Sequence, residues 1–194
     1  MNVAQYMRPD TVTVLGGMPL GEAKQVMEEN GFGLLLVTTA EHQLKGFITK
    51  GTLSGVTDWD APVESVCHEA RFAVSPADTL EKAALILLEN RLVLLPVVNE
   101  DHRLVGVLTQ SEILRGLAYG FGIGLEGARL TVKVRHDSQD LYKVLRVLRD
   151  HDVHLISIAR GESLGDYRDV ILRVQGVADK EGLCAELEAV LREG

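Results

Sequence analysis

The chain has 194 residues, enough for one large domain or two small ones, and 46% hydrophobic with 25% charged residues is a globular balance. This composition excludes a fibrous or disordered protein. The formal net charge of −8 disfavours a nucleic-acid partner, because the overall field repels a phosphate backbone.

The two cysteines, Cys67 and Cys184, form neither a disulfide framework nor a zinc-binding pattern, and free thiols are typical of a reducing compartment. No apolar run has the length needed to span a bilayer. The N-terminal residues lack the basic and apolar segments of a signal peptide. We therefore expect a cytoplasmic protein that does not contact a membrane.

An internal repeat occupies the first 118 residues. A shift of 60 residues aligns, without a gap, MEENGFGLLLVTTAEHQLKGFITK with LLENRLVLLPVVNEDHRLVGVLTQ. The identical pairs include Ala23 with Ala83, Asn30 with Asn90, His42 with His102, Leu44 with Leu104, Gly46 with Gly106, and Thr49 with Thr109. Such self-similarity indicates two versions of one structural unit. We call residues 1–58 copy 1 and residues 59–118 copy 2.

Both copies predict the same order of elements. An extended run, at residues 12–14 or 72–74, precedes a helical period, which in copy 2 follows the helix-start signals of residues 75–78. Two apolar runs joined by a polar turn then predict a hairpin, and a helix follows Thr49 or Thr109. Each copy is therefore strand, helix, strand, strand, helix, with an apolar sheet face that the other copy can cover.

A glycine-rich stretch, residues 119–128, follows copy 2 and predicts a linker. It contains a formal G-x-G-x-x-G at Gly122, Gly124 and Gly127. In a dinucleotide-binding site this spacing follows a strand and opens a helix. Here a helix precedes it and a strand follows it, so the sequence disfavours a dinucleotide site.

The remaining residues, 129–194, predict a second unit. Its patterns indicate strand 130–135, helix 139–150, strand 153–159, strand 169–174 and helix 179–191. This is most of a βαββαβ ferredoxin-like unit, but the sequence stops after the last helix and the fourth strand is absent. The first strand is then expected to be an open edge, which favours association with a second copy of the chain.

Short motifs in both copies carry a resemblance to a known family. The hairpins end in GFIT at residues 46–49 and GVLT at residues 106–109, and LPVV lies in the first hairpin strand of copy 2. The two copies resemble a tandem pair of CBS domains. The residues LYKVLRVLRDHDVHLISI are similar to an ACT domain, and the combination resembles the acetoin-utilisation regulatory proteins of bacteria. The resemblance implies an α/β fold: a CBS-domain pair (Bateman module) and a ferredoxin-like ACT domain lacking its last strand.

The same resemblance implies a regulatory protein that binds an adenine nucleotide, AMP, ADP or ATP, between the copies and modulates an unidentified metabolic enzyme. In copy 2, Thr109 is expected to contact a phosphate, because a hydroxyl beside a helix N-terminus suits an anion. Glu112 is expected to contact the ribose hydroxyls, because a carboxylate suits a vicinal diol. Arg115 lies one helical turn further on. In copy 1, Thr49 is followed by Thr52 and Gly55, which supply neither a carboxylate nor a guanidinium, so this cleft is expected to be weaker although Lys50 could meet a phosphate. The apolar strand residues expected around the adenine are Val74, Leu94 and Pro96.

Other interpretations of these residues stay open. Thr49 and Thr109 can simply cap the helices that follow them, and Glu112 suits a first helical turn by its charge alone. The chain is also compatible with a constitutive dimeric scaffold whose clefts are empty, or with an amino-acid sensor acting through residues 129–194. The sensor is disfavoured because Gln139 or Asp140 stands where ACT domains usually have a glycine.

We expect neither catalysis nor a resident metal. His151 and His154 straddle a helix end and a strand start, and no further ligand completes a metal set. Ser163 lacks the strand–turn–helix context of a nucleophile elbow. The sequence therefore favours a non-enzymatic, homodimeric protein with no required cofactor other than its regulatory nucleotide.

Overall fold

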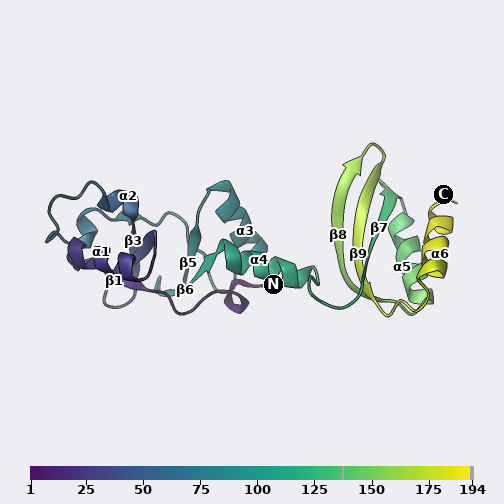
Figure 1. The fold of residues 1–194 in the computed structure, drawn as a ribbon, viewed down its shortest axis with the longest axis horizontal. Helices are drawn as coiled ribbons and strands as arrows, with labels where there is room; N and C mark the ends of the chain where they lie inside the picture. Colours follow the sequence, from purple (N-terminus) through teal and green to yellow (C-terminus); the bar gives the residue numbers. More distant parts are fainter. Residues whose placement is uncertain (137, 193–194) are drawn as a thin grey trace. The chain divides into compact units, whose positions relative to one another are not determined.

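The computed structural model describes residues 1–136 and 138–192. The chain divides into two compact units, Met1–Gly116 (unit 1) and Leu117–Gly194 (unit 2), which are described separately below (Figure 1). Within the described residues, every helix is too short or too polar to cross a bilayer.

Unit 1 contains both sequence copies. Its elements are η1 (Val3–Gln5), β1 (Thr13–Leu15), α1 (Leu20–Glu29), β2 (Leu34–Thr38), β3 (Leu44–Thr49), α2 (Lys50–Leu53), η2 (Val63–Ser65), β4 (His68–Glu69), α3 (Leu80–Glu89), β5 (Leu94–Val98), β6 (Leu104–Thr109) and α4 (Gln110–Gly120), whose last residues belong to unit 2. The predicted order is present in both copies. The predicted strand at residues 72–74 is the exception, since only Val74 pairs, with Val97, and the next amide, that of Ser75, donates to the Asp78 carboxylate over 2.8 Å.

The sheets of the two copies have one plan. In copy 1 the strand order is β1-β2-β3-β4, with β1 parallel to β2 and the other pairs antiparallel. In copy 2 the antiparallel pair β5–β6 is flanked by Val74, which pairs parallel with Val97, and by Arg8, which pairs antiparallel with Val107. The flanking positions in copy 2 correspond to β1 and β4 of copy 1.

The two copies exchange their first segments. Val63, in the part of copy 2 that precedes its sheet, packs in the core of copy 1, and its amide donates to the Met18 carbonyl over 2.8 Å. Val3, the aligned residue at the start of copy 1, donates to the carbonyl of Asp78 in copy 2 over 2.9 Å. Both valines are fully buried. Each copy is therefore completed by backbone and side chains from the other.

A glycine at each crossing point permits this exchange. Gly46 in β3 lies against the β4 backbone, and a Cβ there would overlap the carbonyl oxygen of His68. At Gly106 in β6, a Cβ would lie 2.7 Å from the carbonyl oxygen of Arg8. The first position of each G-h-h-T motif is thus glycine because another chain segment passes too close for a side chain.

Helical periodicity places one face of α1 and α3 in the core. The buried positions are Leu20, Ala23 and Met27 in α1, and their aligned counterparts Leu80, Ala83 and Leu87 in α3. The helix α3 begins at an N-cap, Thr79, whose side-chain oxygen accepts from the amide of Lys82 over 3.2 Å. These helices hold the strands that frame the pocket described below.

Unit 2 contains β7 (Ala128–Arg135), α5 (Asp140–Asp150), β8 (His154–Leu164), β9 (Tyr167–Gln175) and α6 (Lys180–Arg192). The sheet is antiparallel with the order β7-β9-β8, and α5 and α6 lie on one of its faces (Figure 1). The predicted elements are all present, and the hairpin continues beyond the predicted strand end at residue 159, to a turn at Gly165. Among the described residues of unit 2, β7 pairs with β9 alone, so its other edge is unpaired there.

Alanine substitution tests the crossing. Gly46→Ala is expected to lower the free energy of unfolding by at least about 2 kcal/mol, because the added methyl group collides with backbone that belongs to another segment. Gly17→Ala is the control, since a Cβ there meets nothing within 4 Å. Urea unfolding measures both; equal stability of the two variants would contradict the close approach.

Candidate functional site

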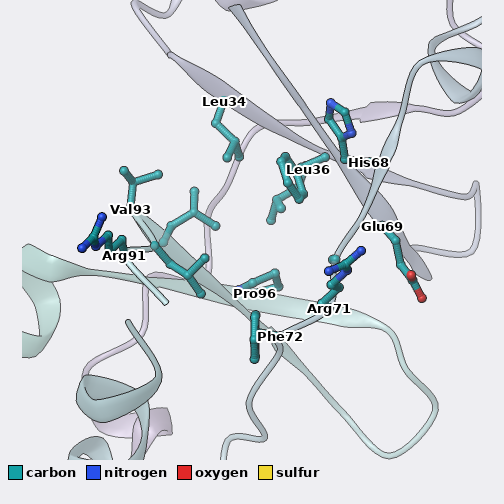
Figure 2. A pocket seen from close by; sticks show the side chains of 13 residues that line it. Leu34, Leu36, His68, Glu69, Arg71, Phe72, Arg91, Val93 and Pro96 are labelled. Carbon is teal, nitrogen blue, oxygen red and sulfur yellow. The ribbon is translucent and has the colours of Figure 1, made fainter. Parts of the chain in front are cut away.

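A cavity of about 470 Å³ lies in unit 1 between the two copies (Figure 2). Its lining residues come from β2, β3, β4, the segment of copy 2 that follows β4, the turn after α3, and β5: Leu34, Leu36, Phe47, His68, Glu69, Ala70, Arg71, Phe72, Arg91, Leu92, Val93, Leu94 and Pro96. Figure 2 shows Leu34 and Leu36 on one side and Pro96 and Phe72 on the other. The centre of the cavity is therefore apolar, and we call it the inter-copy pocket.

Charged side chains lie at the ends of this pocket. Figure 2 shows Arg91 at one end and Arg71 at the other, where His68 and Glu69 also lie. Two guanidinium groups against one carboxylate make the pocket locally basic in a chain whose net charge is −8. An apolar slot with basic ends suits a flat, uncharged ring that carries an anionic group.

The predicted residues Leu94 and Pro96 line the pocket. Val74 lies behind them, almost fully buried, and its amide donates to the Pro96 carbonyl over 3.0 Å. The threonines of the two G-h-h-T motifs stand at the pocket margin, because Thr109 is the cross-strand partner of Leu94 and Thr49 is that of Leu34.

The Glu112 carboxylate is hydrogen-bonded to a residue close to it in the sequence, Thr109. Its carboxylate accepts hydrogen bonds from the hydroxyl of Thr109 and from the Thr109 amide, the latter over 3.0 Å, and the residue is only 6% exposed. Burial raises the pKa of this carboxyl, but the hydrogen bonds from Thr109 outweigh burial, so the pKa lies below its ordinary value of 4.5. The ionised Glu112 carboxylate is thus held by the Thr109 amide and hydroxyl at the start of α4.

Copy 1 has a neutral version of this arrangement. Thr49 and Thr52 form a capping box, in which the Thr52 amide donates to the Thr49 hydroxyl over 3.1 Å. The Thr52 hydroxyl also lies 3.0 Å from Nε2 of His68, and the His68 ring packs near Phe47 with 5.6 Å between ring centroids. The copy 1 motif therefore connects to the pocket through His68.

Two predicted residues lie elsewhere. Lys50 lines a separate cavity of about 480 Å³ with Lys24 and Trp59, whose ring centroid is 4.8 Å from the Lys24 ammonium. Arg115 is exposed on α4 and is not among the residues that line the inter-copy pocket. Within the described residues, His, Cys, Asp and Glu side chains nowhere gather in threes that could hold a metal ion.

Sequence reasoning missed the pocket residues His68, Arg71, Phe72 and Arg91. Sequence reasoning gave Phe72 only a place in an extended run, and it did not predict the two-residue strand β4 that contains His68 or the irregular segment that contains Arg71. Arg91 carried a usable signal in the sequence, because the repeat aligns it with Gly31. In the structure both residues have a positive φ, +52° for Arg91 and +67° for Gly31.

Comparison with known proteins identifies unit 1. A family model described as CBS domain matches residues 3–55 and 63–119. A CBS domain pair/ACT domain protein from Thermotoga maritima is 26% identical, with a TM-score of 0.56 over 61% of this chain and 98% of that one. The acetoin-utilization protein AcuB from Vibrio cholerae is 25% identical, with a TM-score of 0.55 over 61% of this chain and 91% of that one.

A third structure contains a ligand. CBSX2, a CBS-pair protein from Arabidopsis thaliana, was solved in complex with AMP and is 23% identical, with a TM-score of 0.54 over 61% of this chain and 96% of that one. The chain spans only 23% to 30% of the first curated relatives it matches. These include an inosine-5'-monophosphate dehydrogenase from Methanocaldococcus jannaschii, 28% identical over 149 residues, or 77% of this chain.

The Thr109–Glu112 pair predicts a pH-dependent contribution to stability. Because the pKa of Glu112 is lower in the folded state, its contribution is complete above the ordinary value of 4.5 and is lost as pH falls through the folded-state pKa. Glu112→Gln should cost about 1–2 kcal/mol of unfolding free energy near pH 7 and much less near pH 3. Glu81→Gln, at an exposed first-turn position of α3, is the control. Equal losses for Glu112→Gln at both pH values would contradict an ionised cap.

Proposed function

Because the chain belongs to the CBS-domain family, we propose that it is a regulatory protein whose inter-copy pocket binds an adenine nucleotide. One observation carries the proposal: the pocket is an apolar slot between β2 and β5 with guanidinium groups at its ends. The complex of CBSX2 with AMP supports this class of ligand for the fold. The adenine would occupy the centre, against Leu36, Pro96 and Phe72, and the phosphates would lie at a basic end.

Residues at the pocket margin complete the proposed site. Thr109 would bind a phosphate or ribose oxygen with its hydroxyl, and Glu112, which now accepts from Thr109, would accept from a ribose hydroxyl. Val74 would act through Pro96, to which it is hydrogen-bonded. Thr49 would contribute through Thr52 and His68.

Two predicted charged residues do not line this pocket. Arg115 is exposed on α4 and Lys50 lines another cavity, so either would have to move to reach a nucleotide. Their role in binding therefore rests on the family resemblance alone.

The proposed regulatory signal is a change in the arrangement of the two copies when a nucleotide binds between them. The pocket is lined by residues of both copies, so a nucleotide would favour the arrangement of the copies that fits it best. A metabolic enzyme that contacts unit 1 would then respond to nucleotide level. The likeness to AcuB supports a place in acetoin or related carbon metabolism.

Unit 2 would be an ACT-like domain, as its β7-β9-β8 order and two helices support. An amino-acid ligand is less well supported. At the start of α5, where such a ligand would be expected, the Asp140 carboxylate is buried and accepts two hydrogen bonds from the Arg135 guanidinium, at 2.8 and 3.0 Å. This ion pair holds the pKa of Asp140 well below its usual range, so a charged, buried side chain stands where ACT domains usually have a glycine.

A homodimer is part of the proposal. Leu88 and Leu85, one turn apart on α3, are 75% and 55% exposed, and Leu114 on α4 is 69% exposed; we name these three residues the leucine face. The aligned residues of copy 1 are polar: Glu28, Gln25 and Ser54. Two leucine faces can therefore pack together around a two-fold axis, whereas packing against copy 1 would bury the charge of Glu28. The same face would serve a dimeric scaffold with empty clefts.

Nucleotide binding is tested by a pair of aligned substitutions. Phe72→Ala should lower the affinity for AMP, ADP or ATP by about ten- to a hundredfold, because stacking of a base on an aromatic ring contributes about 1–3 kcal/mol. Val12→Ala, the aligned residue in copy 1 and outside this pocket, should have little effect. Calorimetric titration gives both affinities. If only Val12→Ala lowers the nucleotide affinity, the ligand binds in another cleft. If the unmodified protein binds no nucleotide, the dimeric scaffold with empty clefts is favoured.

The dimer contact is tested at Leu88. Leu88→Glu gives copy 2 the residue that copy 1 has at this place, and it should convert the dimer to a monomer at micromolar concentration because two carboxylates would meet at the axis. Tyr142→Glu, an equally exposed position on α5, is the control. Sedimentation equilibrium measures the mass. If the Leu88→Glu variant dimerises with unchanged affinity, the leucine face is not the dimer contact. The free edge of β7 would then become the candidate contact.

A further inference from the structure

Arg91 occupies a backbone position that favours glycine. The helix α3 ends at Glu89, and Arg91 follows its cap residue, Asn90, with φ +52°. Copy 1 repeats this turn with Gly31 at φ +67°. The hydrogen bond that closes the turn is also repeated, from the Leu92 amide to the Leu87 carbonyl over 3.0 Å in copy 2 and from the Phe32 amide to the Met27 carbonyl over 2.9 Å in copy 1.

The turn itself does not call for an arginine. Helices often end with a left-handed residue, which is usually glycine because a Cβ is disfavoured there. Copy 1 follows that rule and copy 2 departs from it, although the two turns have the same hydrogen bonds. Asp152 has the same conformation after α5, with φ +54°, so the place of the Arg91 side chain matters more than its φ. In this structure, the Arg91 side chain lines the inter-copy pocket.

The end of the pocket where Arg91 lies is suited to an anion. The next residue, Leu92, accepts a hydrogen bond over 3.3 Å from Nε2 of Gln110, the first residue of α4, so this end adjoins the N-terminus of an eleven-residue helix. Thr109 is also close, as the cross-strand partner of Leu94. The opposite end has Arg71 but also the carboxylate of Glu69 (Figure 2). An anionic group is therefore expected beside Arg91.

We propose that Arg91 is a specificity-determining residue that binds the outer phosphates of the nucleotide, so that the pocket favours nucleoside di- and triphosphates over the monophosphate and the nucleoside. This inference rests on the proposed function and adds the class of nucleotide and the group that selects it. The exposed guanidinium at the pocket end can reach phosphates that extend beyond the ribose, while the base lies in the apolar centre. Gly31 gives copy 1 no such group.

The test is Arg91→Gly, which puts the copy 1 residue into the same turn. Titrations with ATP, ADP, AMP and adenosine should show at least about a tenfold loss of ATP and ADP affinity and less than about a twofold change for adenosine. Without ligand, the variant should unfold at the same or a higher denaturant concentration, because glycine is favoured at this φ. A purely structural role for Arg91 predicts the opposite change in stability. Arg103→Ala, outside this pocket, is the matched control and should keep all four affinities.

The outcomes separate this inference from the proposed function. If the unmodified protein binds ATP and Arg91→Gly binds it equally well, or loses ATP and adenosine to the same extent, the role of Arg91 is overturned alone. If Arg71→Ala removes the preference for ATP and Arg91→Gly does not, the phosphates lie at the other end and the inference is again wrong. If the unmodified protein binds none of the four ligands, the proposed function falls as well.

Discussion

Each copy of unit 1 is completed by a segment of the other, and the close backbone contacts at Gly46 and Gly106 make this possible. Val3 and Val63 enter the copies to which they do not belong in sequence, and both are fully buried. Neither copy can therefore keep its core if the two separate, since each would lose a buried valine and a set of backbone hydrogen bonds. The exchange fixes the strands that face each other across the inter-copy pocket.

The pocket follows from that arrangement. The segment that crosses between the copies supplies His68, Arg71 and Phe72, while β5 and the turn before it supply Pro96 and Arg91. The two sequence copies differ at this place: Arg91 of copy 2 aligns with Gly31 of copy 1, and the Glu112 carboxylate bonded to Thr109 aligns with Thr52 bonded to Thr49. Two copies with the same element order therefore enclose a pocket whose two ends carry different residues.

Local patterns predicted much of the fold. The 60-residue shift predicted two like copies, and the elements of unit 2 occur where strand and helix periods placed them, as at residues 130–135 and 139–150. The exchange was not predictable, because pairing of Arg8 with Val107 is a non-local contact that leaves no local period. Two of the residues that line the pocket were expected from the sequence: Pro96 from the LPVV motif and Leu94 from the apolar strand that contains this motif. Arg71 was missed because it lies in an irregular segment, and Phe72 was predicted only as part of a strand in which Val74 alone pairs. The motif neighbour Lys50 lines a different cavity.

Hydrogen exchange with and without ATP tests the central claim, that the nucleotide is held between the two copies. The account predicts that a saturating nucleotide slows amide exchange in peptides covering residues 34–36, 68–72 and 91–96 together, since these segments line one pocket. Exchange in unit 2 should change much less. Protection confined to unit 2, or no protection anywhere at saturating ATP, ADP or AMP, would contradict the account.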